Sequence, residues 1–217
     1  MGTTAFVGCY DDASETPISG TGKTLSMTGF GYLDSLSGKE IWSNYETTFS
    51  DKVIGFQAMI TKIRTELKPL KTYKDALERP GLVLLVTEMQ EILNSCGSEN
   101  NKILFVDSFA HQLRKYGVDM YYDTQRFKNI HIRLRTHTDT ILIPFKRHFD
   151  KKPCYSTQCL KPHLIDVYSI KPDREKPIIR FLAPVLGKKY NTYQVVYDKL
   201  FIPNKKQTKE PEEDECS

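Results

Sequence analysis

The chain has 217 residues, 39% of them hydrophobic and 27% charged, which lies within the range of soluble globular proteins. This length accommodates one three-layer α/β domain with extra elements and is short for two. The net charge of +4 is too small to indicate a nucleic-acid partner by itself. No stretch approaches about 18 uninterrupted apolar residues, no signal peptide is evident, and five scattered cysteines do not suggest a disulfide framework, so we expect a reducing, intracellular compartment.

The first predicted strand covers residues 3–10, a run rich in β-branched and aromatic residues. A polar, turn-forming segment at residues 11–19 separates it from a glycine turn that ends in Lys23 and Thr24. The apolar periodicity of residues 25–36 predicts a helix directly behind this turn.

A glycine turn that ends in Lys-Thr and opens a helix is typical of sites that hold a nucleotide triphosphate. Its backbone N–H groups face the phosphates, Lys23 reaches the outer phosphates and the Thr24 hydroxyl binds Mg²⁺. The predicted nucleotide-binding residues are Gly20, Thr21, Gly22, Lys23, Thr24 and Leu25. The alternative is an ordinary glycine turn before a helix.

The full pattern G-x-x-x-x-G-K-[ST] would place glycine at position 17, where this chain has Pro17. Two explanations remain open. Either Gly8 supplies the first glycine and the loop carries an insertion, or Pro17 replaces that glycine.

Strands and helical patterns alternate along the rest of the chain, which favours an α/β fold with a central, mainly parallel sheet and helices on both faces. The expected core strands are residues 3–9, 40–45, 82–86, 118–122 and 140–145. The expected helices are residues 25–36, 56–67, 73–78 and 101–116. Residues 164–170 and 178–182 are predicted to pair as a hairpin that extends the sheet.

The all-apolar strand at residues 82–86 is followed by Thr87 and Glu88. A carboxylate at the carboxyl end of a central parallel strand would lie beside the phosphate loop, where open α/β sheets bind ligands. Glu88 could there polarise a water molecule as a general base or positioning group. The alternative is that Glu88 merely opens the next helix, where a negative charge is favourable.

Together the glycine turn, the apolar strand ending in glutamate and the segment 117–139 resemble the HerA/FtsK superfamily of DNA-pumping ATPases, especially its small viral members. The segment 117–139 (G-V-D-M-Y-Y-D-T-Q-R-F … L-R-T-H-T-D) is the most specific part, and phage-assembly ATPases related to zonula occludens toxin share it. The resemblance covers residues 1–145 and implies a three-layer P-loop NTPase fold of the RecA/ASCE type with C-terminal β additions.

The resemblance also implies site residues. Glu88 matches the catalytic glutamate and Gln125 the polar residue that senses the γ-phosphate, while Arg114, Arg133 and Arg135 are candidates for an arginine that acts on a neighbouring subunit's nucleotide. The family's acidic pair is Asp-Glu, whereas this chain has Thr87 before the glutamate. With Thr24 and an uncharged Thr87 as the metal-site residues, we expect Mg²⁺ to be held more weakly and hydrolysis to be reduced.

The function that the resemblance implies is ATP-driven, Mg²⁺-dependent DNA translocation, most plausibly the packaging of viral DNA into a capsid. The implied partners are DNA bound without sequence preference, further copies of the chain in a ring, and capsid or portal-vertex proteins, in the host cytoplasm or the virion. The alternatives are a phage-assembly or secretion ATPase and a nucleotide-binding subunit that has lost hydrolysis.

Basic residues offer candidate DNA contacts: Lys128, Arg133 and Arg135 first, then Lys188 and Lys189 in the basic segment 187–199. Solvation of an exposed surface is the alternative interpretation.

Residues 147–162 are basic and rich in turn formers. His148, Cys154, Cys159 and His163, spaced H-x5-C-x4-C-x3-H, offer four zinc ligands, but the spacing lacks the short C-x2-C form, which favours thiols without a metal. We expect one domain at residues 1–203, with its core at 1–145 and an extension at 146–203, and a disordered charged tail at 204–217.

Overall fold

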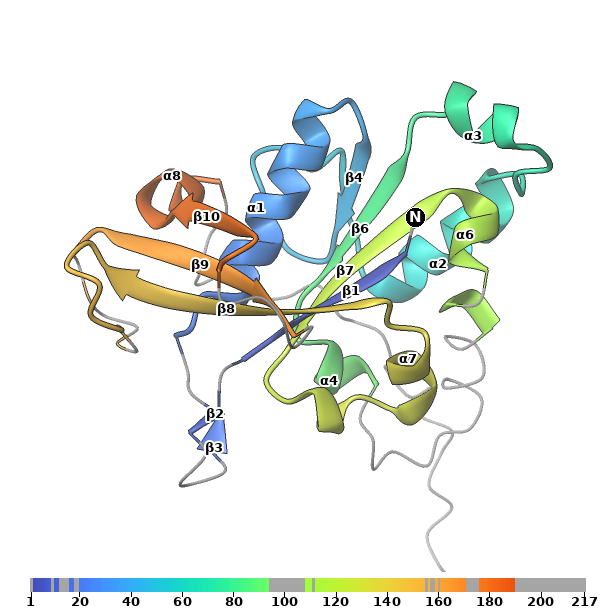
Figure 1. Ribbon diagram of the computed structural model, residues 1–217. Coiled ribbons are helices and arrows are strands. Elements are labelled where there is room, and N and C mark those ends of the chain that lie inside the picture. The colour runs from blue at the N-terminus through green and yellow to red at the C-terminus, as the bar shows by residue number, and fades with distance from the viewer. Residues whose placement is uncertain are drawn as a thin grey trace, which may run out of the picture.

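The computed structural model describes residues 2–8, 10–11, 16–17, 20–93, 108–110, 112–154, 156, 159, 161–170 and 176–189. An eight-stranded sheet with the order β10-β9-β8-β1-β7-β6-β4-β5 forms its centre (Figure 1). The strands are β1 (Thr3–Val7), β4 (Glu40–Ser43), β5 (Lys52–Val53), β6 (Leu82–Val86), β7 (Val118–Thr124), β8 (Thr140–His148), β9 (His163–Ser169) and β10 (Ile179–Leu182). The helices are α1 (Lys23–Leu36), α2 (Phe56–Glu66), α3 (Tyr73–Glu78), α4 (Met89–Ile92), α6 (Leu113–Tyr116), the 3₁₀ turn η1 (Phe127–Asn129), α7 (Ile132–Thr136) and α8 (Ala183–Gly187).

The strands from β8 to β5 in this order pair in parallel, and β9 and β10 add to β8 in antiparallel fashion. This arrangement confirms the predicted α/β fold, with its mainly parallel central sheet and C-terminal β hairpin. All five expected core strands are present, with ends that differ by a few residues from the predicted ones.

Strand β6 is an interior strand between β7 and β4, and every one of its residues is apolar and buried. Its odd and even positions face opposite sides of the sheet. Leu84 packs in a cluster with Ile60 of α2, and Leu85 packs in a second cluster with Met27 of α1. Helix α1 approaches β6 so closely that a Cβ atom on Gly31 would lie 2.6 Å from Cδ1 of Leu85. Helices therefore cover both faces, which gives three layers.

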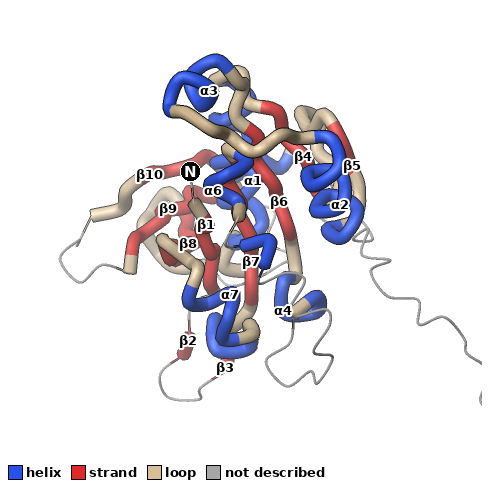
Figure 2. The backbone as a smooth tube through the Cα atoms, turned by 90° about the vertical axis from the view of Figure 1, so that its right-hand side faces the viewer, coloured by secondary structure: helices blue, strands red, loops and turns tan. Residues whose placement is uncertain are grey.

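The segment between β1 and the glycine turn contains a small antiparallel ribbon of β2 (Tyr10–Asp11) and β3 (Thr16–Pro17), in which Pro17 pairs with Tyr10. Gly8, at the end of β1, donates its N–H to the carbonyl of Thr124 at 3.3 Å. The chain thus leaves the sheet at Gly8 and returns at the turn, which favours an insertion over a simple replacement of glycine by Pro17. Figure 2 shows this ribbon and α4 near one end of the parallel strands, and the N-terminus and α3 near the other.

Several predicted segments are described only in part. The helix expected at residues 101–116 appears as helical residues 108–110 and as α6, which Gly117 ends with a φ of 71°, and residues 101–107 lie outside the described part. Most of the segment 187–199 and the whole tail 204–217 also lie outside it. Among the helices that the structure describes, none is both long and apolar enough to cross a bilayer.

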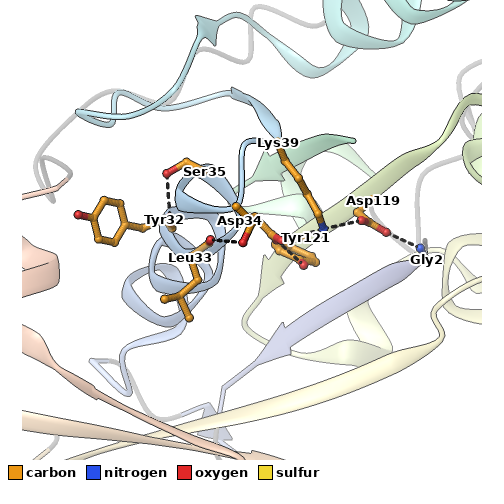
Figure 3. Close-up of polar contacts among 9 residues, drawn as sticks. Gly2, Tyr32, Leu33, Asp34, Ser35, Lys39, Asp119 and Tyr121 are labelled. Carbon is orange, nitrogen blue, oxygen red and sulfur yellow. Dashed lines mark hydrogen bonds and ion pairs between the residues drawn. The ribbon is translucent and has the colours of Figure 1, made fainter. Parts of the chain in front are cut away.

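A polar network fastens the end of α1 to the sheet at the amino ends of the strands (Figure 3). The Lys39 ammonium lies 2.7 Å from Asp34 and 3.1 Å from Asp119. The Tyr121 hydroxyl donates to Asp34 at 2.7 Å, and the N–H of Gly2 donates to Asp119 at 2.8 Å. Burial alone would lower the pKa of Lys39, but the two carboxylates raise it above its ordinary value. The network ties the C-terminal end of α1 to β7 and to the residue before β1.

The C-terminal strands are joined by a buried ion-pair group. Asp166 of β9, which is 2% exposed, accepts hydrogen bonds from Nε of Arg147 at 2.7 Å and from Nε of Arg180 at 2.5 Å. Burial alone would raise the pKa of Asp166, but the bonds from Arg180 and Arg147 lower it below its ordinary value. The ionised Asp166 therefore stabilises the fold. Because the pKa of Asp166 is lower in the folded state than in the unfolded state, this stabilisation is present above the unfolded-state pKa and is lost as the pH falls through the folded-state pKa.

We therefore expect Asp166→Asn to lower the free energy of unfolding at pH 7 by about 2–3 kcal/mol, since it leaves two guanidinium groups without their carboxylate. Urea denaturation measures this change. Glu66→Gln, which removes an exposed pair with Lys62 on α2, is the matched control and should leave stability unchanged. Equal stability of the Asp166 variant and the control would contradict the prediction.

Candidate functional site

The carboxyl ends of β1, β7 and β6 meet at one edge of the sheet because these neighbouring strands are parallel. The glycine turn and the first residue of α1 lie at this edge, together with the residues that follow β6 and the end of β7. This is the edge where open α/β sheets hold their ligands.

The glycine turn has the backbone that its residues require. Gly20 and Gly22 have φ values of 73° and 90°, in the left-handed region that favours glycine. A Cβ atom on Gly22 would lie 3.1 Å from Cδ1 of Ile165, so β9 also limits this position to glycine. The carbonyl of Gly22 accepts the N–H of Ser26 at 2.8 Å and starts α1. The Thr21 side chain is 1% exposed, and its buried hydroxyl has no hydrogen-bond partner in the described part of the chain.

Lys23, the first residue of α1, is only 7% exposed. Its ammonium donates to Oε1 of Gln125 at 3.0 Å, and the N–H of Gln125 in turn donates to Oε1 of Gln90 at 3.3 Å. The structure thus places the predicted phosphate-binding lysine against the predicted sensor at the end of β7. Leu25, the other predicted loop contact, is partly buried against the apolar cluster that contains Met27.

Asp123, near the end of β7, is fully buried at the centre of this edge. Its carboxylate accepts the Thr24 hydroxyl at 2.5 Å, the Thr87 hydroxyl at 3.0 and 3.1 Å, and the backbone N–H of Glu88 at 2.7 Å. Burial raises the pKa of Asp123, and the bonds from Thr24 and Glu88 and the charge of Lys23 partly offset this rise. Asp123 is not among the site residues predicted from the sequence.

The backbone of Thr87 is held by Asn44, a buried residue that follows β4. Its N–H donates to Oδ1 of Asn44 at 2.9 Å, and Nδ2 of Asn44 donates to the Thr87 carbonyl at 3.2 Å. The backbone after β6 is therefore fixed from β4, and the Thr87 hydroxyl is directed to Asp123 as a donor. Thr87 itself contributes no charge. The carboxylate beside Thr24 and Thr87 is that of Asp123 on the neighbouring strand β7.

Glu88 has φ 55° and ψ 44°, a left-handed conformation that costs energy for a residue with a side chain. Its side-chain carboxylate accepts a hydrogen bond from the Gln90 amide, and its backbone N–H is bound to Asp123. Burial and the neighbouring charge of Asp123 raise the pKa of Glu88. A strained backbone and a partly buried carboxylate with a raised pKa are typical of an acid–base residue in a functional site.

The three predicted arginines do not lie together. Arg114 forms an ion pair with Asp139 before β8, at the amino ends of the strands, opposite to the glycine turn. Arg133 and Arg135 belong to α7, where Arg133 is exposed and Arg135 partly buried. Of the candidate DNA contacts, Lys128 is exposed in η1, whereas Lys189 lies 4.3 Å over the ring of Tyr32.

No family model and no curated protein matches this chain. Among solved structures, it is similar to the N-terminal domain of zonular occludens toxin from Neisseria meningitidis, with 14% identity, 88% of this chain and 100% of that chain covered, and a TM-score of 0.46. It is also similar to the genome packaging NTPase B204 of Sulfolobus turreted icosahedral virus 2 in complex with ATP-gammaS, with 14% identity, 82% and 98% coverage and a TM-score of 0.47. The pCW3 conjugation coupling protein TcpA follows with 12% identity, 83% and 59% coverage and a TM-score of 0.44. These are proteins of the kinds that the sequence resembles.

Proposed function

We propose that this chain is a P-loop ATPase of the HerA/FtsK kind that binds ATP with Mg²⁺ and hydrolyses it to move DNA, packaging a viral genome. The observation that carries the proposal is the convergence of five side chains at one edge of the sheet. These are Lys23, Thr24, Glu88, Asp123 and Gln125.

The residues at this edge suit a magnesium nucleotide. Asp123 and Thr24 offer hard oxygen ligands side by side, and the buried Thr21 hydroxyl lacks a partner within the described chain, as expected of a loop that awaits a polar ligand. Magnesium bound with ATP neutralises charge on the outer phosphates. Thr24 and Asp123 are the residues that would hold it, so the charge missing at Thr87 comes from β7.

The remaining side chains orient the reactants. Lys23 provides a fixed positive charge for the outer phosphates, and its bond to Gln125 gives a direct path between a bound phosphate and the end of β7. Glu88, once ionised, accepts a hydrogen bond from water and positions it for attack on the γ-phosphate. In a ring, Arg114, Arg133 or Arg135 would add positive charge to the nucleotide of a neighbouring copy.

If Asp123 of β7 supplies the carboxylate that is missing at Thr87, then exchanging the residue types at these two positions should preserve the effect of Mg²⁺ on ATP binding. Asp123→Thr should lose most of the strengthening of ATP binding by Mg²⁺. Thr87→Asp alone places a second carboxylate where the Thr87 hydroxyl lies 3.0 Å from Asp123, so we expect mutual repulsion and weaker binding. The double variant Thr87→Asp/Asp123→Thr should recover the Mg²⁺ effect. Titration with a non-hydrolysable ATP analogue measures it, and a double variant no better than Asp123→Thr would contradict the exchange.

DNA dependence separates this function from a second candidate, a nucleotide-binding subunit without hydrolysis, which the uncharged Thr87 favours. A translocase should hydrolyse ATP faster with duplex DNA of any sequence, and the stimulation should decrease with salt as phosphate contacts weaken. ATP that is bound but not hydrolysed, even with DNA, would support the second candidate instead.

A further inference from the structure

The connection between β8 and β9 brings together four side chains that the nucleotide site does not use. His148 ends β8 and His163 begins β9, and the two are direct partners in the antiparallel register. Their ring centroids are 4.6 Å apart. Two metal-ligating side chains are thus fixed side by side by the pairing of the strands alone.

A tight backbone turn brings Cys154 to the same place. The N–H of His148 donates to the carbonyl of Lys152 at 2.8 Å, and the N–H of Cys154 donates to the carbonyl of Lys146 at 3.0 Å. Lys151, with a φ of 69°, makes the reversal. Because Cys154 lies opposite Lys146 and alternate residues share a face, it projects to the same side of β8 as His148.

Cys159 completes a compact set. One ligand atom from each of His148, Cys154, Cys159 and His163 lies within 4.8 Å of the others. Tetrahedral zinc, with Zn–S of about 2.3 Å and Zn–N of about 2.0–2.1 Å, separates its ligand atoms by about 3.3–3.8 Å. Only a small contraction would therefore bring all four into coordination.

Two ring nitrogens of this set also lack a partner in the described part of the chain. Nδ1 of His148 and Nε2 of His163 are buried and have no hydrogen bond within the described part of the chain, and His163 is 5% exposed. A buried polar atom without a partner costs free energy. Here two such ring nitrogens lie beside the free thiols of Cys154 and Cys159, and a bound metal would explain all four.

We propose that His148, Cys154, Cys159 and His163 form a structural Cys₂His₂ zinc site that closes the end of the β8–β9 hairpin. Two thiolates and two neutral imidazoles satisfy zinc completely, which leaves no open position for catalysis. The site shares no residue with the nucleotide edge and does not depend on the proposed function.

The position of the site explains the need for a metal. Strand β8 continues for six residues beyond Leu142, the last of its residues that pairs with β1, which is a distance of about 20 Å. Figure 1 shows the β8–β9 hairpin reaching away from the rest of the sheet. Strand β10 pairs with β9 only as far as Leu164, so at His148 and His163 the end of the hairpin has two strands alone. A two-stranded end has little core of its own, and a metal can supply the stability that packing does not.

Cobalt titration of the full-length, reduced and metal-free chain tests the proposal. We expect about one Co²⁺ per chain, with a thiolate charge-transfer band and the intense visible bands of tetrahedral coordination, and its displacement by Zn²⁺. Cys154→Ser and Cys159→Ser should each lower the affinity for zinc by about 100-fold or more. Cys96→Ser makes the same chemical change outside the set and should retain full binding.

A thiol count on the unmutated chain covers the case in which a variant fails to fold. Zinc should protect two of the five cysteines from a thiol reagent, and a chelator should expose them. All five thiols reacting equally with and without zinc, or a cobalt spectrum that lacks thiolate bands, would overturn the proposal.

Discussion

Lys23→Ala is expected to reduce ATP turnover by about 100- to 1,000-fold and to weaken ATP binding, because it removes a fixed charge from the outer phosphates. The side chain is buried at the start of α1 and bound to Gln125. Alanine is a good helix former, and the fold should persist.

Steady-state ATP hydrolysis and equilibrium binding of an ATP analogue measure the two effects. Lys62→Ala, which removes an exposed lysine of α2, serves as the matched control and should behave as the unmutated chain. If Lys23→Ala hydrolysed ATP as fast as this control, the glycine turn would not be the phosphate site.

Glu88→Gln is expected to reduce turnover by about 100- to 10,000-fold while ATP binding is retained, since the amide cannot accept a proton from water. Glutamine keeps the size of the side chain, and the backbone N–H bond to Asp123 is unaffected. Glu91→Gln, three residues along the chain in α4, is the matched control.

The pH profile gives the prediction for Glu88 a second readout. Burial and Asp123 raise the pKa of Glu88, and only its ionised form can position water as a base, so turnover should rise with pH through a value above that of an ordinary glutamate. This acidic limb should be absent from the residual activity of Glu88→Gln. Its persistence there would assign the limb to another group.

Local sequence signals sufficed for the elements of the sheet. The all-apolar run from Leu82 to Val86 could only be a strand covered on both faces, and the glycine turn before a periodic segment located α1. The two strands expected at residues 164–170 and 178–182 pair in antiparallel fashion, as predicted. These features depend on residues close together in the chain.

The site was harder to predict because its chemistry depends on register between distant strands. Val86 pairs with Tyr122, so the next residues, Thr87 and Asp123, meet at the same edge. The sequence does place an aspartate, Asp123, near the end of the strand that leads to Gln125. The family pattern, however, has its aspartate directly after β6, where this chain has Thr87, so the pattern does not point to Asp123. The same reason applies to His148, which meets His163 only through strand pairing.

The effect of Mg²⁺ on ATP binding by Asp123→Asn tests the central claim most directly. In the unmutated chain, Mg²⁺ should tighten binding of a non-hydrolysable ATP analogue by about tenfold or more, and Asp123→Asn should remove most of this effect. Asp119→Asn makes the same change on the same strand at its opposite end, and should leave the Mg²⁺ effect intact. A full Mg²⁺ effect in Asp123→Asn would show that the buried carboxylate of β7 does not hold the metal, and would contradict the account.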